Sequence, residues 1–338
     1  MRGRRTLALS MAVVAAGVMT AVAAYYLDPG RGTVGPMPGV GLALPAATRM
    51  VSGLDVRRLV KSPVYRLFFR SGGARPQAFT ELQARTGLNL ERDVDHVILS
   101  AQAQDGRTGT VAIVSGAFDR QKVAAAVLRQ PNIATRTHEG RPLYVFHADG
   151  APPSALAFLE DDVLALGTEA EVEQTVTGYV RGTGGLKGAP LLALVESVRP
   201  GSAVWSVGDE TLLGQLSGAL PAAGGLPGMT LPGLRSVVFS AEVDPAVSFE
   251  AIVQTADEKA AQQIAGMASL IQGMASMQGG QRPEMKQLAS SISVTTEKSS
   301  VRVNGRLSDE LLEALQRRSS AAGAPRAPEP PAAIGPAR

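Results

Sequence analysis

Two stretches decide the fold: Val94-Asp95-His96-Val97-Ile98-Leu99-Ser100-Ala101 and Leu234-Arg235-Ser236-Val237-Val238-Phe239-Ser240-Ala241. Each is a short run rich in β-branched and apolar residues that ends in Ser-Ala, and such runs are typical of strands. They lie 140 residues apart, and similar segments follow both in the same order. The sequence therefore predicts a strand-rich unit that occurs twice.

Three further pairs of segments keep nearly the same spacing, 138 residues: Val111–Ser115 with Phe249–Val253, the helix starts at Asp119 and Asp257, and Val163–Gly167 with Val301–Gly305. Four matches in the same order predict two divergent copies of a β-β-α-β-β-α unit. Such a unit gives an α+β fold, in which a largely antiparallel sheet carries helices on one face.

Local signals place further elements. Ser and Asp before apolar periods predict helix starts at Asp55 and at Ser62-Pro63, and Gly87 ends a helix predicted over Arg75–Thr86. The turn Gln104-Asp105-Gly106 predicts a hairpin. Other expected elements are strands over Pro142–His147, Ala155–Leu159, Val163–Leu166 and Ala203–Val207, and a helix over Glu169–Arg181.

Residues 1–26 have the pattern of an export or anchoring segment. Arg2, Arg4 and Arg5 precede an uncharged run over residues 6–26, which as a helix nearly spans a hydrocarbon core of about 30 Å. Ala21-Val22-Ala23 also fits signal-peptide cleavage. We therefore expect an uncleaved anchor in the cytoplasmic membrane with the body outside, or a cleaved, periplasmic or secreted chain.

The remaining chain divides by composition. We expect a flexible Pro/Gly-rich linker over 27–47, a first α+β unit with N-terminal helices over 48–210, and a Gly/Pro-rich junction over 211–233. A second unit follows over 234–318, and an Ala/Pro-rich disordered tail over 319–338.

Charge excludes a nucleic-acid partner. Three of the 33 basic residues lie in residues 1–5 and no acid precedes Asp28, which leaves 30 charges of each sign in the body. A local excess of eight basic over two acidic residues lies between Arg49 and Arg85. It is either a solvated helix face or a contact with anionic lipid headgroups.

No catalytic, cofactor-binding or metal site is predicted. The chain has no cysteine and three histidines, His96, His138 and His147. In Asp93-Val94-Asp95-His96, a strand would turn His96 away from the two carboxylates. His147 lies near Asp149, but a Gly-x-Ser-x-Gly nucleophile sequence is absent.

A methionine-rich stretch is the one candidate binding surface. Met267, Ile271, Met274 and Met277 recur at nearly helical spacing. This pattern indicates the buried face of a helix that starts at Asp257. The alternative is a surface that adapts to an apolar ligand or a partner protein.

Several segments together resemble a family of uncharacterised, exported or membrane-anchored bacterial proteins known only as a domain of unknown function. They are Leu44-Pro45-Ala46-Ala47, Val51–Asp55, "LNLERDVD" over Leu88–Asp95, Gly140–Tyr144, "FLEDDVLALGTEAEVEQTV" over Phe158–Val176, and Leu191–Trp205. The resemblance implies export and a shared fold, and it transfers no functional residue.

The leading hypothesis is a non-enzymatic, membrane-tethered envelope protein that binds another envelope component. The alternative is a carrier or sensor of a lipid-like apolar ligand. A third possibility, an envelope hydrolase, requires His138 or His147 beside a hydroxyl or a carboxylate.

Overall fold

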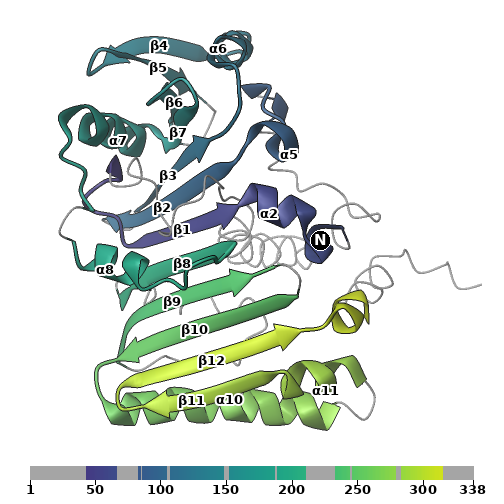
Figure 1. The fold of residues 1–338 in the computed structure, drawn as a ribbon. Coiled ribbons are helices and arrows are strands. Elements are labelled where there is room, and N and C mark those ends of the chain that lie inside the picture. Colours follow the sequence, from purple (N-terminus) through teal and green to yellow (C-terminus); the bar gives the residue numbers. More distant parts are fainter. Residues whose placement is uncertain are drawn as a thin grey trace, which may run out of the picture.

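The protein is an α+β fold built around one large antiparallel sheet. The computed structural model describes residues 43–66, 83–84, 86–104, 107–147, 152–186, 189–210, 233–243, 246–278 and 283–314. In this part of the chain twelve strands follow the order β11-β12-β10-β9-β8-β1-β2-β3-β7-β6-β5-β4 (Figure 1). The predicted fold class is confirmed at this level.

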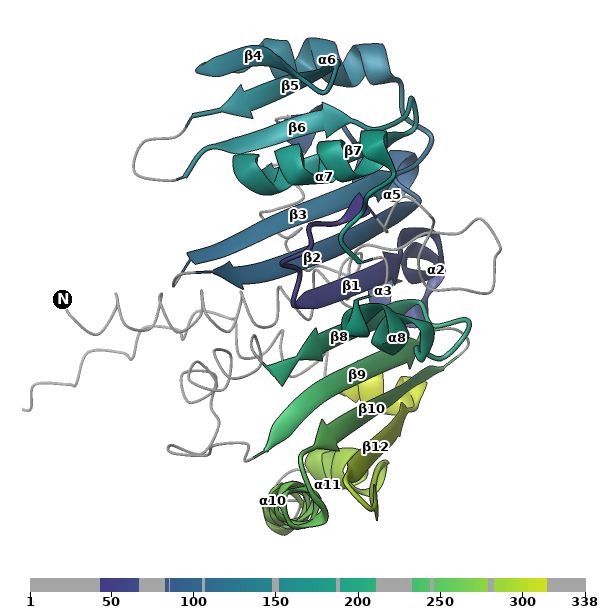
Figure 2. The same ribbon diagram turned by 90° about the vertical axis from the view of Figure 1, so that its left-hand side faces the viewer.

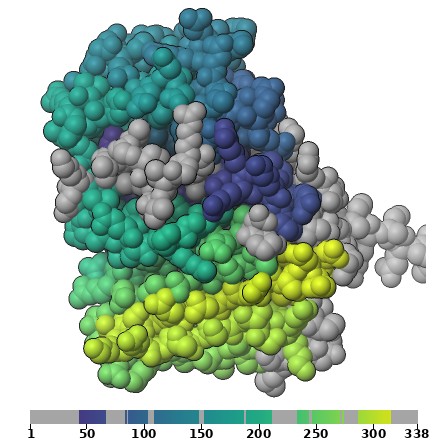
Figure 3. Space-filling view, in the orientation of Figure 1, coloured from purple at the N-terminus to yellow at the C-terminus, as the bar shows by residue number. Residues whose placement is uncertain are grey.

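The strands divide between the two halves of the chain. The upper half of the sheet in Figure 1 holds β1 (Met50–Asp55), β2 (His96–Gln104), β3 (Arg107–Ser115), β4 (Ile133–His138), β5 (Arg141–Phe146), β6 (Ser154–Phe158) and β7 (Val163–Thr168). The lower half holds β8 (Val204–Asp209), β9 (Leu234–Glu242), β10 (Val247–Thr255), β11 (Ile292–Glu297) and β12 (Ser300–Leu307). The space-filling view shows the same division, with blue and teal residues above green and yellow ones (Figure 3).

The two halves join through β1 and β8, which pair antiparallel in the middle of the sheet. Ser52 lies opposite Ser206 at the centre of this pair. From there the rung continues to Leu99 and Ala112 on one side and to Phe239 and Ala251 on the other. Hydrogen bonding is therefore continuous across the join.

The helices begin where local capping groups predict them. Asp55 accepts from the N–H of Arg58 at the start of α2 (Val56–Lys61), and Ser62 accepts from Tyr65 at the start of α3 (Pro63–Tyr65). Asp119 caps α6 (Arg120–Leu128). The other described helices are α5 (Leu90–Asp93), α7 (Glu169–Arg181), α8 (Pro190–Glu196), α10 (Glu258–Gln278) and α11 (Pro283–Ser290), and residues 309–314 are also helical.

The prediction that the helices cover one face of the sheet is wrong. Ile98 packs in a cluster with residues of α7 and α8, whereas its neighbour Val97 packs in a cluster with Val123 and Val127 of α6. Successive strand residues point to opposite faces, so helices cover both faces. The physical reason is that strands such as β2 carry apolar residues at consecutive positions, which leaves no polar face for solvent.

The body begins earlier than the composition predicts. Ala43 and Leu44 are buried, Leu44 completely, although the linker is predicted to extend to residue 47. The N–H of Gly185 donates to the Leu44 carbonyl at 3.0 Å, and the side chain of Leu44 packs with α7 and α8. Residues 43–47 therefore belong to the core on that face.

Several predicted features lie outside the described residues: the anchor or signal segment over 1–26, most of the linker, the helix over Arg75–Thr86 apart from its end, the junction apart from Gly233, and the tail. The predicted end of that helix at Gly87 is confirmed, since Gly87 has φ +73° and its N–H donates to Gln83. Within the described ranges, no helix combines the length and apolarity needed to span a membrane.

Candidate functional site

The outermost strand β4 forms one end of the sheet and is its most accessible strand edge. Figure 2 shows β4 at the top of the molecule, with α6 beside it and with α10 and α11 at the opposite end. Among the described strands, only β5 pairs with β4. Ala134, Thr135, Arg136 and Thr137 are all exposed.

The hydrogen-bond pattern of the hairpin fixes which backbone groups of β4 face outward. The N–H of His147 donates to the carbonyl of Asn132 at 3.2 Å. Bonded and non-bonded pairs alternate in an antiparallel ladder, so Ala134, Arg136 and His138 bond to β5. Ile133, Thr135 and Thr137 therefore direct their N–H and C=O groups away from the sheet.

A two-residue turn sets this register. Glu139 and Gly140 both have positive φ, 48° and 75°, as a type I′ turn requires. Arg181 at the end of α7 donates to Glu139 at 2.5 Å, and this ion pair holds the turn against the helix.

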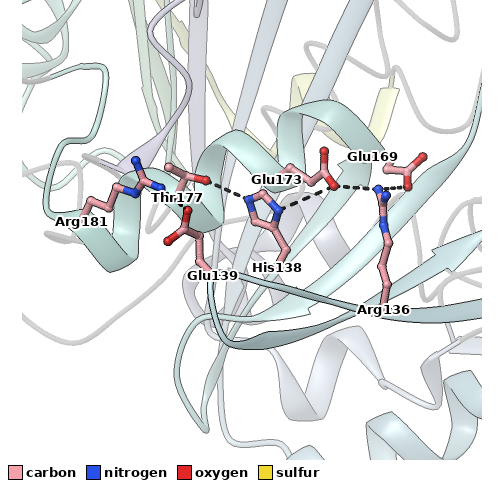
Figure 4. Close-up of polar contacts among 7 residues, drawn as sticks. All are labelled: Arg136, His138, Glu139, Glu169, Glu173, Thr177 and Arg181. Carbon is pink, nitrogen blue, oxygen red and sulfur yellow. Dashed lines mark hydrogen bonds and ion pairs between the residues drawn. The ribbon is translucent and has the colours of Figure 1, made fainter.

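Helix α7 supports β4 from one face of the sheet through a polar network (Figure 4). Glu169 and Glu173 lie one turn apart on the helix and both accept from Arg136, Glu173 at 2.6 Å. Glu169 also lies in the first turn, where the helix dipole favours negative charge. The charge of Arg136 is thus directed towards α7.

His138 completes the network and is the one histidine placed beside a hydroxyl and a carboxylate. Its Nε2 lies 2.8 Å from Oγ1 of Thr177, and its Nδ1 lies 3.8 Å from Oε1 of Glu173. The order hydroxyl, imidazole, carboxylate is the order of a hydrolase triad. Thr177, however, lies inside α7, where its own N–H bonds to the carbonyl four residues earlier and is not available to stabilise an oxyanion. This geometry favours a structural link between β4 and α7.

The other two histidines lie apart from this network. His147 is exposed directly after β5, and Asp149, its sequence neighbour, lies outside the described residues. His96 begins β2 opposite Asp55. Burial, and then the charge of Arg57, lower the pKa of His96 to about 3, so its ring stays neutral in the folded protein.

The cluster around Asp95 serves the end of the sheet. Asp93 ends α5 and does not lie on a strand as predicted, because Asn89 caps a short helix there. Asp93 bonds to Arg92, whereas the buried Asp95 accepts from Arg57 at 2.5 Å. The two carboxylates therefore have separate partners.

Part of the basic region between Arg49 and Arg85 is neutralised within the body. Arg49 pairs with Asp209 at 3.4 Å, Arg57 with Asp95, and Arg58 with Asp55 at 3.2 Å. Burial raises the pKa of Asp55, although the N–H and charge of Arg58 act in the opposite direction. These pairs favour the solvated-face interpretation for the described part of the region.

The methionine-rich stretch forms α10, which packs on the face of the sheet opposite α7. Ala261, Ile264 and Met267 contact apolar residues of β10, β11 and β12. Met267 is half-buried and Leu270 is 57% exposed. The side chains of Ile271, Met274 and Met277 lie outside the described residues, as do Met229 and Met285, so the predicted surface stays a prediction.

Sequence reasoning missed β4 itself. Its residues Ile-Ala-Thr-Arg-Thr-His show no apolar alternation. The available signal was local: Glu139-Gly140 suits a two-residue turn before the predicted strand at Pro142, so a partner strand had to precede it.

Comparisons with known proteins return similarity of fold only. No protein-family model matches the chain, and no similar sequence is found among curated proteins. Crystal form III of TP0453 is similar with a TM-score of 0.49 and 11% identity over 84% of this chain and 98% of that chain. Crystal form I of TP0453 is similar with a TM-score of 0.47 and 11% identity over 86% and 99%.

Proposed function

We propose that this protein is a non-enzymatic, membrane-tethered envelope protein whose body binds another envelope component at the edge of β4. One observation carries the proposal: Ile133, Thr135 and Thr137 direct backbone donors and acceptors away from the sheet along an exposed strand. An extended segment of a partner can pair with these groups as an added strand.

The edge lacks the devices that usually prevent such pairing. The β4–β5 register runs unbroken from Ile133 to His138, without a bulge or a proline in β4. The only formally charged side chain of the strand, Arg136, is engaged by two glutamates of α7. A partner strand therefore meets no uncompensated charge along the described edge.

The opposite edge differs in a way that supports the choice of β4. The side chain of Gln272 on α10 donates to the carbonyls of Ala289 and Ile292 at 2.7 and 2.8 Å. By the same alternation, Ile292 is an outward-facing residue of β11. Helix α10 thus occupies part of the β11 edge.

The tether belongs to the same proposal. Residues 6–26 cross the cytoplasmic membrane, and the chain enters the body at Leu44, which is buried between α7, α8 and the sheet. Intact mass of the mature protein distinguishes the alternatives. An uncleaved chain in the membrane fraction supports the anchor, and a chain that begins after Ala23 in the periplasm supports the cleaved form.

Site-specific photo-crosslinking in the native envelope tests the binding surface. A photoreactive residue in place of Thr137 should give a discrete adduct with an envelope component, and one in place of the exposed Gln262 on α10 should not. Adding Thr135→Pro should abolish the adduct, because it removes an outward-facing N–H without breaking a β4–β5 hydrogen bond.

Two outcomes contradict the proposal. The first is the same adduct from both photoreactive positions. The second is an adduct that survives Thr135→Pro in a protein with an unchanged melting temperature.

A second candidate function is the binding of a lipid-like ligand on α10, which the half-buried Met267 and the exposed Leu270 favour. Native mass spectrometry and lipid extraction of residues 27–338 from the periplasm decide between the two. A co-purifying lipid that is lost in Met267→Lys supports the carrier, and a clean apo mass supports the strand-binding protein.

The body is also proposed to consist of two divergent copies, and the strand registers support this. Ser52, Leu99, Ala112 and Leu166 form one rung from β1 to β7, and Ser206, Phe239, Ala251 and Val303 form the corresponding rung from β8 to β12.

This comparison changes the spacing of the proposed repeat. A spacing of 138 equates Val111 with Phe249, whose side chains lie on opposite faces of the sheet. The rungs instead give 140, 139 and 137 for the three outer strand pairs. A shift of one residue exchanges the faces of a strand, so these spacings are the ones that the copies require.

A further inference from the structure

We infer that the partner at the β4 edge is a second copy of this chain, joined by antiparallel pairing of the two β4 strands around Thr135. This inference rests on the β4 edge proposed above as the binding surface, and it names the occupant of that surface.

The first support is that β4 is complementary to itself. With Thr135 opposite its counterpart, Ile133 of one copy lies opposite Thr137 of the other. All three positions are β-branched, and such cross-strand pairs stabilise antiparallel strands. Thr135 also has the outward-facing backbone that this central position needs.

The charged side chain of the strand is compatible with the same arrangement. On the α7 face, Arg136 of one copy lies opposite Ala134 of the other, so two arginines do not lie directly opposite each other. Each Arg136 keeps its own Glu169 and Glu173. Across the pair, no like charges are brought directly opposite each other among the residues of β4.

The join between β1 and β8 is a precedent within this molecule. There two strands pair antiparallel around Ser52 and Ser206, whose hydroxyl oxygens are 2.9 Å apart. The rung through these serines continues through Leu156 and Tyr144 to Thr135. A Thr135–Thr135 pair would repeat the same kind of hydroxyl-centred antiparallel join at the end of that rung.

The geometry of the tether fits two copies in one membrane. A twofold axis between antiparallel strands is perpendicular to the sheet, so corresponding faces of the two sheets lie on the same side. Leu44, where the chain enters the body, lies on the α7 face in both copies. Both tethers therefore leave from the same side. A join of six residues is small, and tethering in one membrane raises its effective concentration.

The absence of native cysteine allows a clean test. In an antiparallel bonded pair the Cα atoms lie about 5.5 Å apart, which is within disulfide range. Full-length Thr135→Cys is oxidised in membranes, or treated with a short bis-maleimide, and compared with Thr296→Cys at the outward-facing position of β11. The expected result is a covalent homodimer for Thr135→Cys and none for Thr296→Cys.

A double variant controls for collisional crosslinking. Thr137→Pro in the Thr135→Cys chain removes an outward-facing N–H and should abolish the dimer, whereas Thr137→Val should retain it. Melting temperatures of both variants show whether the body remains folded.

The outcomes separate this inference from the proposed function. If Thr135→Cys joins only a different envelope protein, the second copy is excluded and the binding edge stands. If Thr135→Cys joins no protein, both are overturned. Equal dimer from Thr135→Cys and Thr296→Cys, or dimer that persists in Thr137→Pro, also overturns the inference.

Discussion

Ser52 and Ser206 lie directly opposite each other on β1 and β8, and their hydroxyl oxygens are 2.9 Å apart. Ser52 is completely buried, whereas Ser206 is half-buried. The two strands come from different halves of the chain, so this hydrogen bond lies where those halves become one sheet. Its energetics are a direct probe of that join.

The two serines should not be equivalent to mutation. Ser206→Ala leaves the buried hydroxyl of Ser52 without this partner, and an unsatisfied buried group costs about 1–3 kcal/mol. Ser52→Ala leaves Ser206, which water can reach, so its cost should be smaller. Urea unfolding of residues 27–338 measures both free energies of unfolding.

The double variant completes the cycle. Ser52→Ala with Ser206→Ala should cost less than the sum of the single changes, because no unpaired hydroxyl remains. Additive effects, or a larger cost for Ser52→Ala, would show that the hydrogen bond does not couple the strands.

Two glycines should respond to alanine with opposite signs. At Gly53 a Cβ would lie 2.4 Å from Cε2 of Trp205, which is buried against the strand. Gly53→Ala should therefore destabilise the protein by about 1–3 kcal/mol through overpacking. At Gly266, inside α10, a Cβ meets nothing within 4 Å. Gly266→Ala should stabilise by about 0.5–1 kcal/mol.

Melting temperatures check both signs in the same protein. Trp205→Leu should recover part of the loss in Gly53→Ala if the clash is its cause. A Gly53→Ala variant as stable as the parent would contradict the close packing of β1 against Trp205.

These positions show why the sequence predicted some elements and missed others. The β2–β3 hairpin and α7 were predicted because an apolar period and a turn or cap signal coincide in each. Strand β1 was missed because Ser52 and Gly53 interrupt its apolar run, although the glycine is what admits Trp205. Edge strands β4 and β11 were missed because exposed edges carry polar residues.

The candidate site was less predictable than the fold. His138 was named in advance, but Thr177 lies 39 residues away in sequence and becomes its neighbour only when α7 packs on the sheet. Outward-facing backbone groups have no sequence signature, since they depend on hydrogen-bond alternation in a hairpin. Sequence patterns therefore predict the buried face of an element better than its free edge.

Stability should fall with acid through His96. Its pKa is about 3 in the folded protein, mainly because of burial, against about 6.5 for an unfolded histidine. Below about pH 6.5 the unfolded chain binds a proton that the folded chain does not. The stabilisation from neutral His96 is thus complete above that pH and is lost as pH falls towards about 3.

Unfolding at about pH 7 and about pH 4.5 measures this linkage, with a slope of at most about 1.4 kcal/mol per pH unit for one proton. His96→Gln should lose less stability over this interval than the parent. The exposed His147→Gln is the matched control and should lose as much as the parent. Equal losses in all three proteins would exclude His96 as the source.

The entry of the chain into the body at Leu44 gives the last prediction. Leu44 is completely buried and packs with residues of α7 and α8, whereas Leu128 at the end of α6 is 55% exposed. Leu44→Ala should cost about 2–5 kcal/mol from lost transfer energy and the cavity left behind, and Leu128→Ala should cost less than about 0.5 kcal/mol. Urea unfolding of both variants gives the comparison. Deletion through residue 42 should leave the unfolding free energy unchanged, and deletion through residue 48 should lower it at least as much as Leu44→Ala. If both deletions were equally stable, residues 43–48 would be part of the linker, and the body would begin at β1.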